Sequence, residues 1–142
     1  MKSVHVLLVE DNEGDIVLTI EALDERKIIN KISIVKDGKQ ALDFLEKKPP
    51  YEAEDLPDII LLDVNLPKKN GHEVLEHIKN SPSLKHIPII MLTTSSLEKD
   101  INLSYENHAN CYITKPVEVD DFLRVVNKIE NFWINIVQLP TK

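Results

Sequence analysis

Short apolar runs alternate with segments of helical period along the chain. The strand-like runs, by residue number, are 4–9, 31–36, 58–63, 87–93 and 110–114. The segments in which apolar residues recur every three or four positions are 13–26, 38–47, 70–80, 97–107 and 118–135. Five strand–helix units are typical of a parallel sheet with helices on both faces. We therefore predict an α/β fold with a doubly wound, five-stranded parallel sheet.

The predicted strands are of two kinds. Three of them, at 6–9, 59–62 and 87–92, are continuously apolar, as expected for parallel strands that helices cover on both sides. The run Lys31–Lys36 instead alternates polar and apolar residues and ends in lysine. This pattern favours a strand at the edge of the sheet.

The composition limits the class of protein. A length of 142 residues predicts a single domain spanning 1–142. The single cysteine, Cys111, excludes an internal disulfide and indicates a reducing compartment. We find no signal peptide and no apolar run near 18 residues, so we expect a cytoplasmic protein with no membrane partner. A net charge of -7 speaks against a nucleic-acid partner, because phosphates are neutralised by basic residues.

Carboxylates follow two of the buried strands. Glu10 and Asp11 come directly after the first strand, and Asp63 ends the third. If these strands are parallel neighbours, the three acids meet at one edge of the sheet. Burying unpaired charges costs several kcal/mol, so such a group needs a cation. Carboxylate oxygens with water suit Mg²⁺, which is usually shared with a phosphate.

Other polar residues lie at strand ends, where open α/β sheets bind their ligands. Thr93 ends the fourth strand, and Lys115 follows the fifth. The segment 10–15 is rich in acids and lacks a run of glycines, so it would repel a bare phosphate. This counts against a flavodoxin or a nucleotide-binding domain.

At these positions the chain resembles the receiver domains of two-component response regulators. That family has an acidic pair after strand one, an acceptor Asp ending strand three, a Ser or Thr ending strand four and a Lys-Pro after strand five. The matching residues here are Glu10-Asp11, Asp63, Thr93 and Lys115-Pro116. The resemblance covers about 4–135 and leaves a short apolar tail at 136–142. It implies a flavodoxin-like sheet with strand order 2-1-3-4-5.

The resemblance also implies a reaction at Asp63. This carboxylate would take a phosphoryl group from the phosphohistidine of a sensor histidine kinase. Mg²⁺ (or Mn²⁺) would be held by Asp11, Asp63, the backbone carbonyl of Asn65 and, through water, Glu10. Asn65 and Ser95 occupy positions that tune hydrolysis of the acyl phosphate. The protein would then be a phosphoacceptor in signalling rather than an enzyme, catalysing only its own phosphotransfer and dephosphorylation.

A switch is implied by the same family. Lys115, with a cis peptide bond to Pro116, would pair with one phosphoryl oxygen, and Thr93 would hydrogen-bond another. The movement of Thr93 would let Tyr112 rotate into the space left behind. The face made by the fourth helix, fifth strand and fifth helix of the predicted series would change with it, for partner binding or dimerisation.

A narrower resemblance is to the single-domain regulators of cyanobacterial phytochrome-like histidine kinases. It lies in Thr93–Ser95, in 109–116 and in the apolar ending of the chain. The predicted helix at 118–135 and the tail carry more apolar residues than one helix on the outside of a sheet needs, and such an excess is an interface signal. Members of that group dimerise, so Phe132, Trp133 and Ile136 are candidate interface residues for a homodimer. The alternative is that the tail folds back and covers this apolar surface.

Two other functions remain open. A receiver-like binding module would work without phosphorylation, although the intact set of five site residues argues against it. A phosphatase with an aspartyl-phosphate intermediate would need a second acid, and Asn65 stands where an Asp-x-Asp pair would have it. Turnover of a small phosphate ester would distinguish the phosphatase from the other two.

Overall fold

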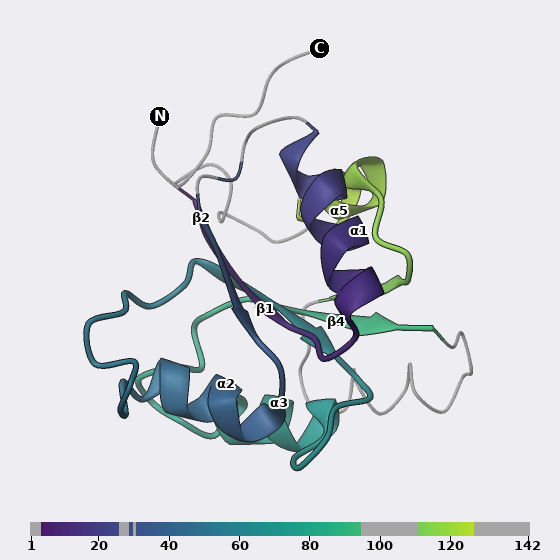
Figure 1. Ribbon diagram of the computed structural model, residues 1–142. Helices are drawn as coiled ribbons and strands as arrows, with labels where there is room; N and C mark the ends of the chain where they lie inside the picture. Colours follow the sequence, from purple (N-terminus) through teal and green to yellow (C-terminus); the bar gives the residue numbers. More distant parts are fainter. Residues whose placement is uncertain (1–3, 26–28, 30, 95–110, 127–142) are drawn as a thin grey trace.

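The fold is a five-stranded parallel sheet with helices on both faces, which confirms the predicted class and strand order (Figure 1). The computed structural model describes residues 4–25, 29, 31–94 and 111–126. The strands run in the order β2-β1-β3-β4-β5. Their bounds are β1 (His5–Val9), β2 (Lys31–Val35), β3 (Ile59–Asp63), β4 (Ile89–Thr93) and β5 (Cys111–Thr114).

Two helices cover each face of the sheet. In Figure 1, α1 and α5 lie above the strands, and α2 and α3 lie below them. The bounds are α1 (Glu13–Asp24), α2 (Gly38–Leu45), α3 (Gly71–Lys79) and α5 (Val119–Val126). The predicted helix at 97–107 lies outside the described residues, as do residue 110 and the stretch 127–135.

Strand residues alternate between two apolar clusters. Leu7 and Leu62 pack with α2 and α3, whereas Leu8 and Leu61 pack with α1 and α5. Every residue of β1, β3 and β4 is buried, as the continuous apolar runs predicted. The strand β2 is only partly buried and lies at the edge of the sheet, as its sequence predicted.

The ends of the elements follow from local chemistry. The strand predicted to begin at Ile87 begins at Ile89, because the Ile87 N–H is used in a turn with Leu84 and Pro88 has no N–H to donate. The helix predicted over 38–47 ends at Leu45, and Lys47 has a positive φ of 58°.

Helices begin immediately after the loops at the carboxyl edge of the sheet. The side chain of Asn12 caps α1 by accepting from the Asp15 N–H at 2.8 Å, and Asn70 forms a capping box with Glu73 on α3. A Cβ at Gly71 would lie 2.3 Å from the carbonyl oxygen of Asp63, so only glycine lets α3 start this close to β3. These contacts fix the loops that surround Asp63.

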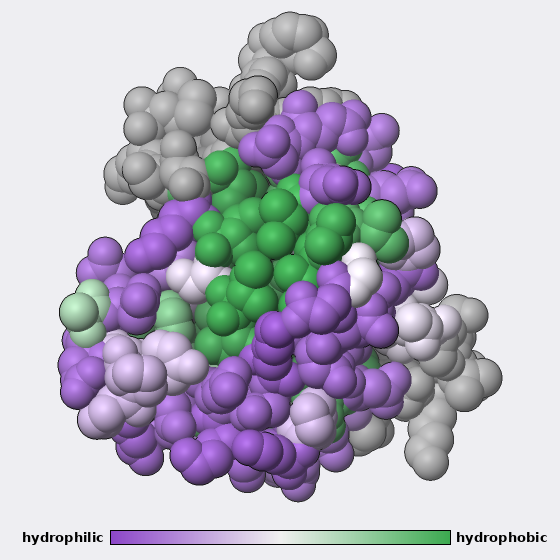
Figure 2. Space-filling model, in the orientation of Figure 1, coloured by the Kyte–Doolittle hydropathy of each residue, from purple (hydrophilic) through white to green (hydrophobic). Residues whose placement is uncertain are grey.

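Some apolar surface stays exposed on the side of the sheet where β2 and α1 lie (Figure 2). Val17 and Leu18 on α1 and Ile34 on β2 are each more than a third exposed. None of the helices in the described ranges is long and apolar enough to cross a membrane.

Candidate functional site

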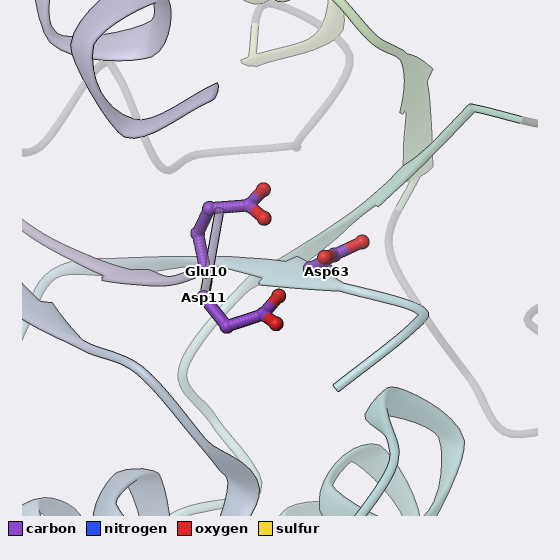
Figure 3. A group of neighbouring side chains, drawn as sticks. All are labelled: Glu10, Asp11 and Asp63. Carbon is purple, nitrogen blue, oxygen red and sulfur yellow. The ribbon is translucent and has the colours of Figure 1, made fainter. Parts of the chain in front are cut away.

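Three carboxylates meet at the carboxyl edge of the sheet (Figure 3). Glu10 and Asp11 follow β1 and Asp63 ends β3, and these two strands are parallel neighbours. One oxygen from each acid lies within 4.8 Å of the others. Glu10 is 0% exposed and Asp63 is 3% exposed, whereas Asp11 faces solvent. The three acids therefore lie together in the structure, as their positions at the strand ends predicted; we call them the acidic group.

Backbone hydrogen bonds continue the sheet into this site. The N–H of Glu10 donates to the Val35 carbonyl at 3.0 Å, and the N–H of Lys115 donates to the Thr93 carbonyl at 2.7 Å. The site residues thus extend from rigid strands, which holds their backbones in a defined place.

Lys115 is the buried cation of the site. Its Nζ lies 2.9 Å from Glu10 Oε1, 2.9 Å from Asp15 Oδ2 and 3.4 Å from Asp63 Oδ2. The Lys115 side chain is only 8% exposed. The peptide bond between Lys115 and Pro116 is cis, as the family resemblance implied.

The sequence analysis missed Asp15. This residue lies in the first turn of α1, and its carboxylate accepts a hydrogen bond from the Lys115 ammonium at 2.9 Å. The only signal was its place in the acid-rich segment 10–15, which does not distinguish it from Glu13. Glu13 instead pairs with Lys36 on the surface.

Burial and charge set the ionisation of the two central residues. Burial first, and then the charge of Glu10, raise the pKa of Asp63 from 3.8 to about 7, against the opposing effects of Lys115 and the Asn65 N–H. Burial alone would lower the pKa of Lys115. Its hydrogen bonds to Asp15 and Glu10 and the charge of Asp63 outweigh burial and raise that pKa. Lys115 is therefore a permanent ammonium, while Asp63 titrates near neutrality.

The raised pKa of Asp63 makes stability fall with rising pH. Between about pH 4 and pH 7 the folded protein keeps a proton that the unfolded chain has released, so ionisation opposes folding in that interval. Asp63→Asn keeps the shape without the charge. We expect its gain in unfolding free energy over wild type to be small near pH 4 and to grow to about 2–4 kcal/mol above pH 7. Denaturant unfolding in EDTA across this range measures it, and a gain that did not change with pH would contradict the assignment.

The remaining site residues are placed as follows. Thr93 ends β4 and is 2% exposed, beside β3 and β5 in the sheet. Tyr112 on β5 is partly buried against the apolar cluster that lies between the sheet and the helices α2 and α3. Asn65 is exposed, and its N–H donates to Asp63 Oδ1 at 3.3 Å. The other candidates lie outside the described residues; they are Ser95, Phe132, Trp133 and Ile136.

The acidic group fits a hard divalent cation. Oxygen ligands are what Mg²⁺ and Mn²⁺ prefer, and the three acids supply them from two neighbouring strand ends. Glu10, Asp15 and Asp63 contact the Lys115 ammonium, and Asp11 lies in the acidic group with Glu10 and Asp63, so four carboxylates share one ammonium and the site retains excess negative charge. A buried carboxylate beside a fixed ammonium and a cation site can act as a nucleophile toward a phosphoryl group.

Known proteins are similar to this chain in sequence and in fold. A model of the response regulator receiver domain matches residues 6–127. The chain is 47% identical over 135 residues to the response regulator Rcp1 from Synechocystis sp. (strain ATCC 27184 / PCC 6803 / Kazusa), spanning 95% of this chain and 92% of that protein.

Two solved structures of response regulators are similar to this chain over nearly its whole length. The crystal structure of the Mn²⁺-bound form of response regulator Rcp1 has a TM-score of 0.77 and 45% identity, covering 99% of this chain and 100% of that one. The crystal structure of the phosphorylated cyanobacterial phytochrome response regulator RcpA has a TM-score of 0.78 and 44% identity, covering 98% and 99%. The receiver-domain match includes Glu10, Asp63 and Lys115.

Proposed function

Because the chain belongs to the response regulator receiver domain family, we propose that it accepts a phosphoryl group from a histidine kinase on Asp63. The observation that carries the proposal is the buried Asp63 carboxylate, which lies 3.4 Å from the Lys115 ammonium and beside Glu10 and Asp11. We further propose that the chain acts as a single receiver domain through contacts with other proteins. A binding module that works without phosphate is not favoured, because the acidic group and its lysine are intact.

The proposed step forms one bond and breaks one. An Asp63 carboxylate oxygen attacks the phosphorus of phosphohistidine, the P–N bond breaks, and the imidazole leaves with the electron pair and takes a proton. Lys115 neutralises negative charge on the transferring group, and Thr93 donates a hydrogen bond to another of its oxygens. Charge stabilisation by fixed groups supplies most of the catalysis in such transfers, and here those groups extend from strand ends.

The same proposal includes a divalent cation. Glu10, Asp11, Asp63 and the backbone carbonyl of Asn65 would hold Mg²⁺ or Mn²⁺, which when bound neutralises charge on the acids and on the phosphoryl group. The Mn²⁺-bound form of Rcp1 supports this choice of metal. The donor set of carboxylate oxygens in this chain supports it independently.

Incubation with acetyl phosphate and Mg²⁺ tests the proposed function. We expect intact-mass spectrometry to show one added phosphoryl group, and we expect EDTA to prevent the addition, because the acids then repel the incoming phosphate. Mn²⁺ in place of Mg²⁺ should also support the reaction. No addition with either metal, or an addition that EDTA leaves unchanged, would refute the proposal.

A change at β5 would carry the signal. We propose that Thr93 moves toward the phosphoryl group and that Tyr112 rotates in response, which alters the face made by β5, α5 and the helix predicted at 97–107. The partly buried position of Tyr112 supports such a role. Asn65 and Ser95 would tune the lifetime of the acyl phosphate.

The kinase partner is proposed to be phytochrome-like. The support is the similarity to the cyanobacterial phytochrome response regulator RcpA and to Rcp1.

We also propose a homodimer in which Phe132, Trp133 and Ile136 lie at the interface. Replacing both Phe132 and Trp133 with Ala is expected to halve the mass of a dimeric parent, because aromatic anchors dominate interface energies. Light scattering after gel filtration measures it. A double variant that elutes as a dimer would exclude these anchors.

A further inference from the structure

The ammonium of Lys115 is surrounded by three carboxylates. An ammonium has three N–H donors, and the acceptors within 3.4 Å belong to Glu10, Asp15 and Asp63. Two of these acids also form the group that fits a cation. Among the acids in the described part of the chain, Asp15 alone contacts Lys115 without belonging to that group.

The Lys115 side chain reaches across the carboxyl edge of the sheet. It comes from the segment after β5, and Asp15 stands on α1, which follows β1; the ends of β4 and β3 lie between them. A lysine side chain has four rotatable bonds and keeps one position only where partners hold its end. Glu10 and Asp15 provide two such partners, each at 2.9 Å.

The backbone of Asp15 is itself fixed. Its N–H donates to the side chain of Asn12 at 2.8 Å, the cap that starts α1. The Asp15 side chain is 29% exposed, so solvent screens its charge only in part. Asp15 is therefore an anchor for Lys115 whose own backbone is held by the cap of α1.

Glu10 takes part in two interactions at the site. Its oxygens contact Lys115, and they also belong to the three-acid group that fits a cation. A divalent cation held in that group would attract Glu10 and repel the ammonium. Asp15 is then the partner that still opposes the displacement of Lys115.

We infer that Asp15 is a positioning residue, which holds the Lys115 ammonium beside Asp63 and acts on phosphoryl transfer through Lys115. The inference rests on the proposed function for its effect on transfer, but the holding of Lys115 can be measured without any phosphate.

Glu13 offers a matched control. It lies in the same first turn of α1 and carries the same charge, yet it pairs with Lys36 and not with Lys115. Asp15→Asn and Glu13→Gln therefore remove one negative charge from the same helix end, and only the first removes an anchor of Lys115.

The first test observes the ammonium directly. Nitrogen-15 NMR selective for lysine side chains should show a slowly exchanging Lys115 signal in the wild type and in Glu13→Gln, because hydrogen bonds and burial slow proton exchange. The signal should be lost or strongly broadened in Asp15→Asn and recovered in part in Asp15→Glu. An unchanged Lys115 signal in Asp15→Asn would overturn the inference.

The second test measures transfer from acetyl phosphate with Mg²⁺. Asp15→Asn is expected to slow phosphorylation on the order of tenfold, since a misplaced charge loses much of its effect on a transition state. Glu13→Gln should react like the wild type. In a Lys115→Met background, Asp15→Asn should have no further effect, because residues that act through one group are not additive.

The outcomes separate the two proposals. A wild type that takes no phosphoryl group refutes the proposed function, whatever the NMR signal shows. A wild type that is phosphorylated, with Asp15→Asn reacting as fast as Glu13→Gln or faster, refutes the inference alone. A slowing by Asp15→Asn that persists in the Lys115→Met background would also contradict an action through Lys115.

Discussion

Asp63→Asn is expected to abolish phosphorylation by acetyl phosphate, down to background in intact-mass spectrometry. An amide has nearly the shape of a carboxylate but is a poor nucleophile, so the phosphoryl group has no acceptor. The fold should survive, because burial and the charge of Glu10 raise the pKa of Asp63 to about 7, so we expect removal of this charge to favour folding at neutral pH. Loss of the reaction would then reflect chemistry and not unfolding.

Asp58→Asn is the control for this experiment. Asp58 lies just before β3, at the opposite end of that strand from Asp63, and its carboxylate accepts a hydrogen bond from the His5 N–H at 2.8 Å. The same change in charge at that end should leave phosphorylation intact. A phosphoryl group that was still added to Asp63→Asn, or that was no longer added to Asp58→Asn, would contradict the assignment of the acceptor.

Lys115→Met is expected to lower the unfolding free energy in EDTA by about 2–4 kcal/mol at pH 8. Removing the ammonium leaves Glu10 and Asp63 buried without their cation, and uncompensated buried charge is costly. Methionine fills much of the same volume, so the loss is electrostatic. Denaturant unfolding measures it, and excess Mg²⁺ should restore part of the stability.

Lys36→Met provides the comparison for that loss. Lys36 pairs with Glu13, and both side chains are more than half exposed. Exposed pairs contribute little, so this variant should stay within about 0.5 kcal/mol of the wild type. Equal losses in the two variants, or a Lys115→Met protein as stable as the wild type without metal, would show that Lys115 does not neutralise the buried acids.

The fold was predictable because each strand has its own local signal. The runs 6–9 and 59–62 are apolar throughout, and burial on both faces is the physical reason. Element ends were less predictable. The strand that was expected from Ile87 starts at Ile89, since a turn hydrogen bond involving Leu84 competes with the sheet for the backbone of that segment.

The candidate site was predictable where it depends on strand ends. Parallel strands bring their carboxyl ends to one edge, so Glu10, Asp63 and Lys115 could be placed together from their positions alone. The hydrogen bond between Lys115 and Asp15 could not be predicted, because it depends on the direction in which a long side chain extends across the ends of β3 and β4. Such contacts have no local pattern in the sequence.

Reduction of the phosphorylated protein with borohydride, followed by peptide mass spectrometry, tests the proposed mechanism most directly. Borohydride reduces an aspartyl acyl phosphate to homoserine and releases phosphate, while phosphoester and phosphohistidine bonds are not converted in this way. The mechanism predicts conversion of Asp63 and of no other carboxylate. Conversion at Asp11, or a phosphoryl group that survives reduction on a serine, threonine or histidine, would contradict it.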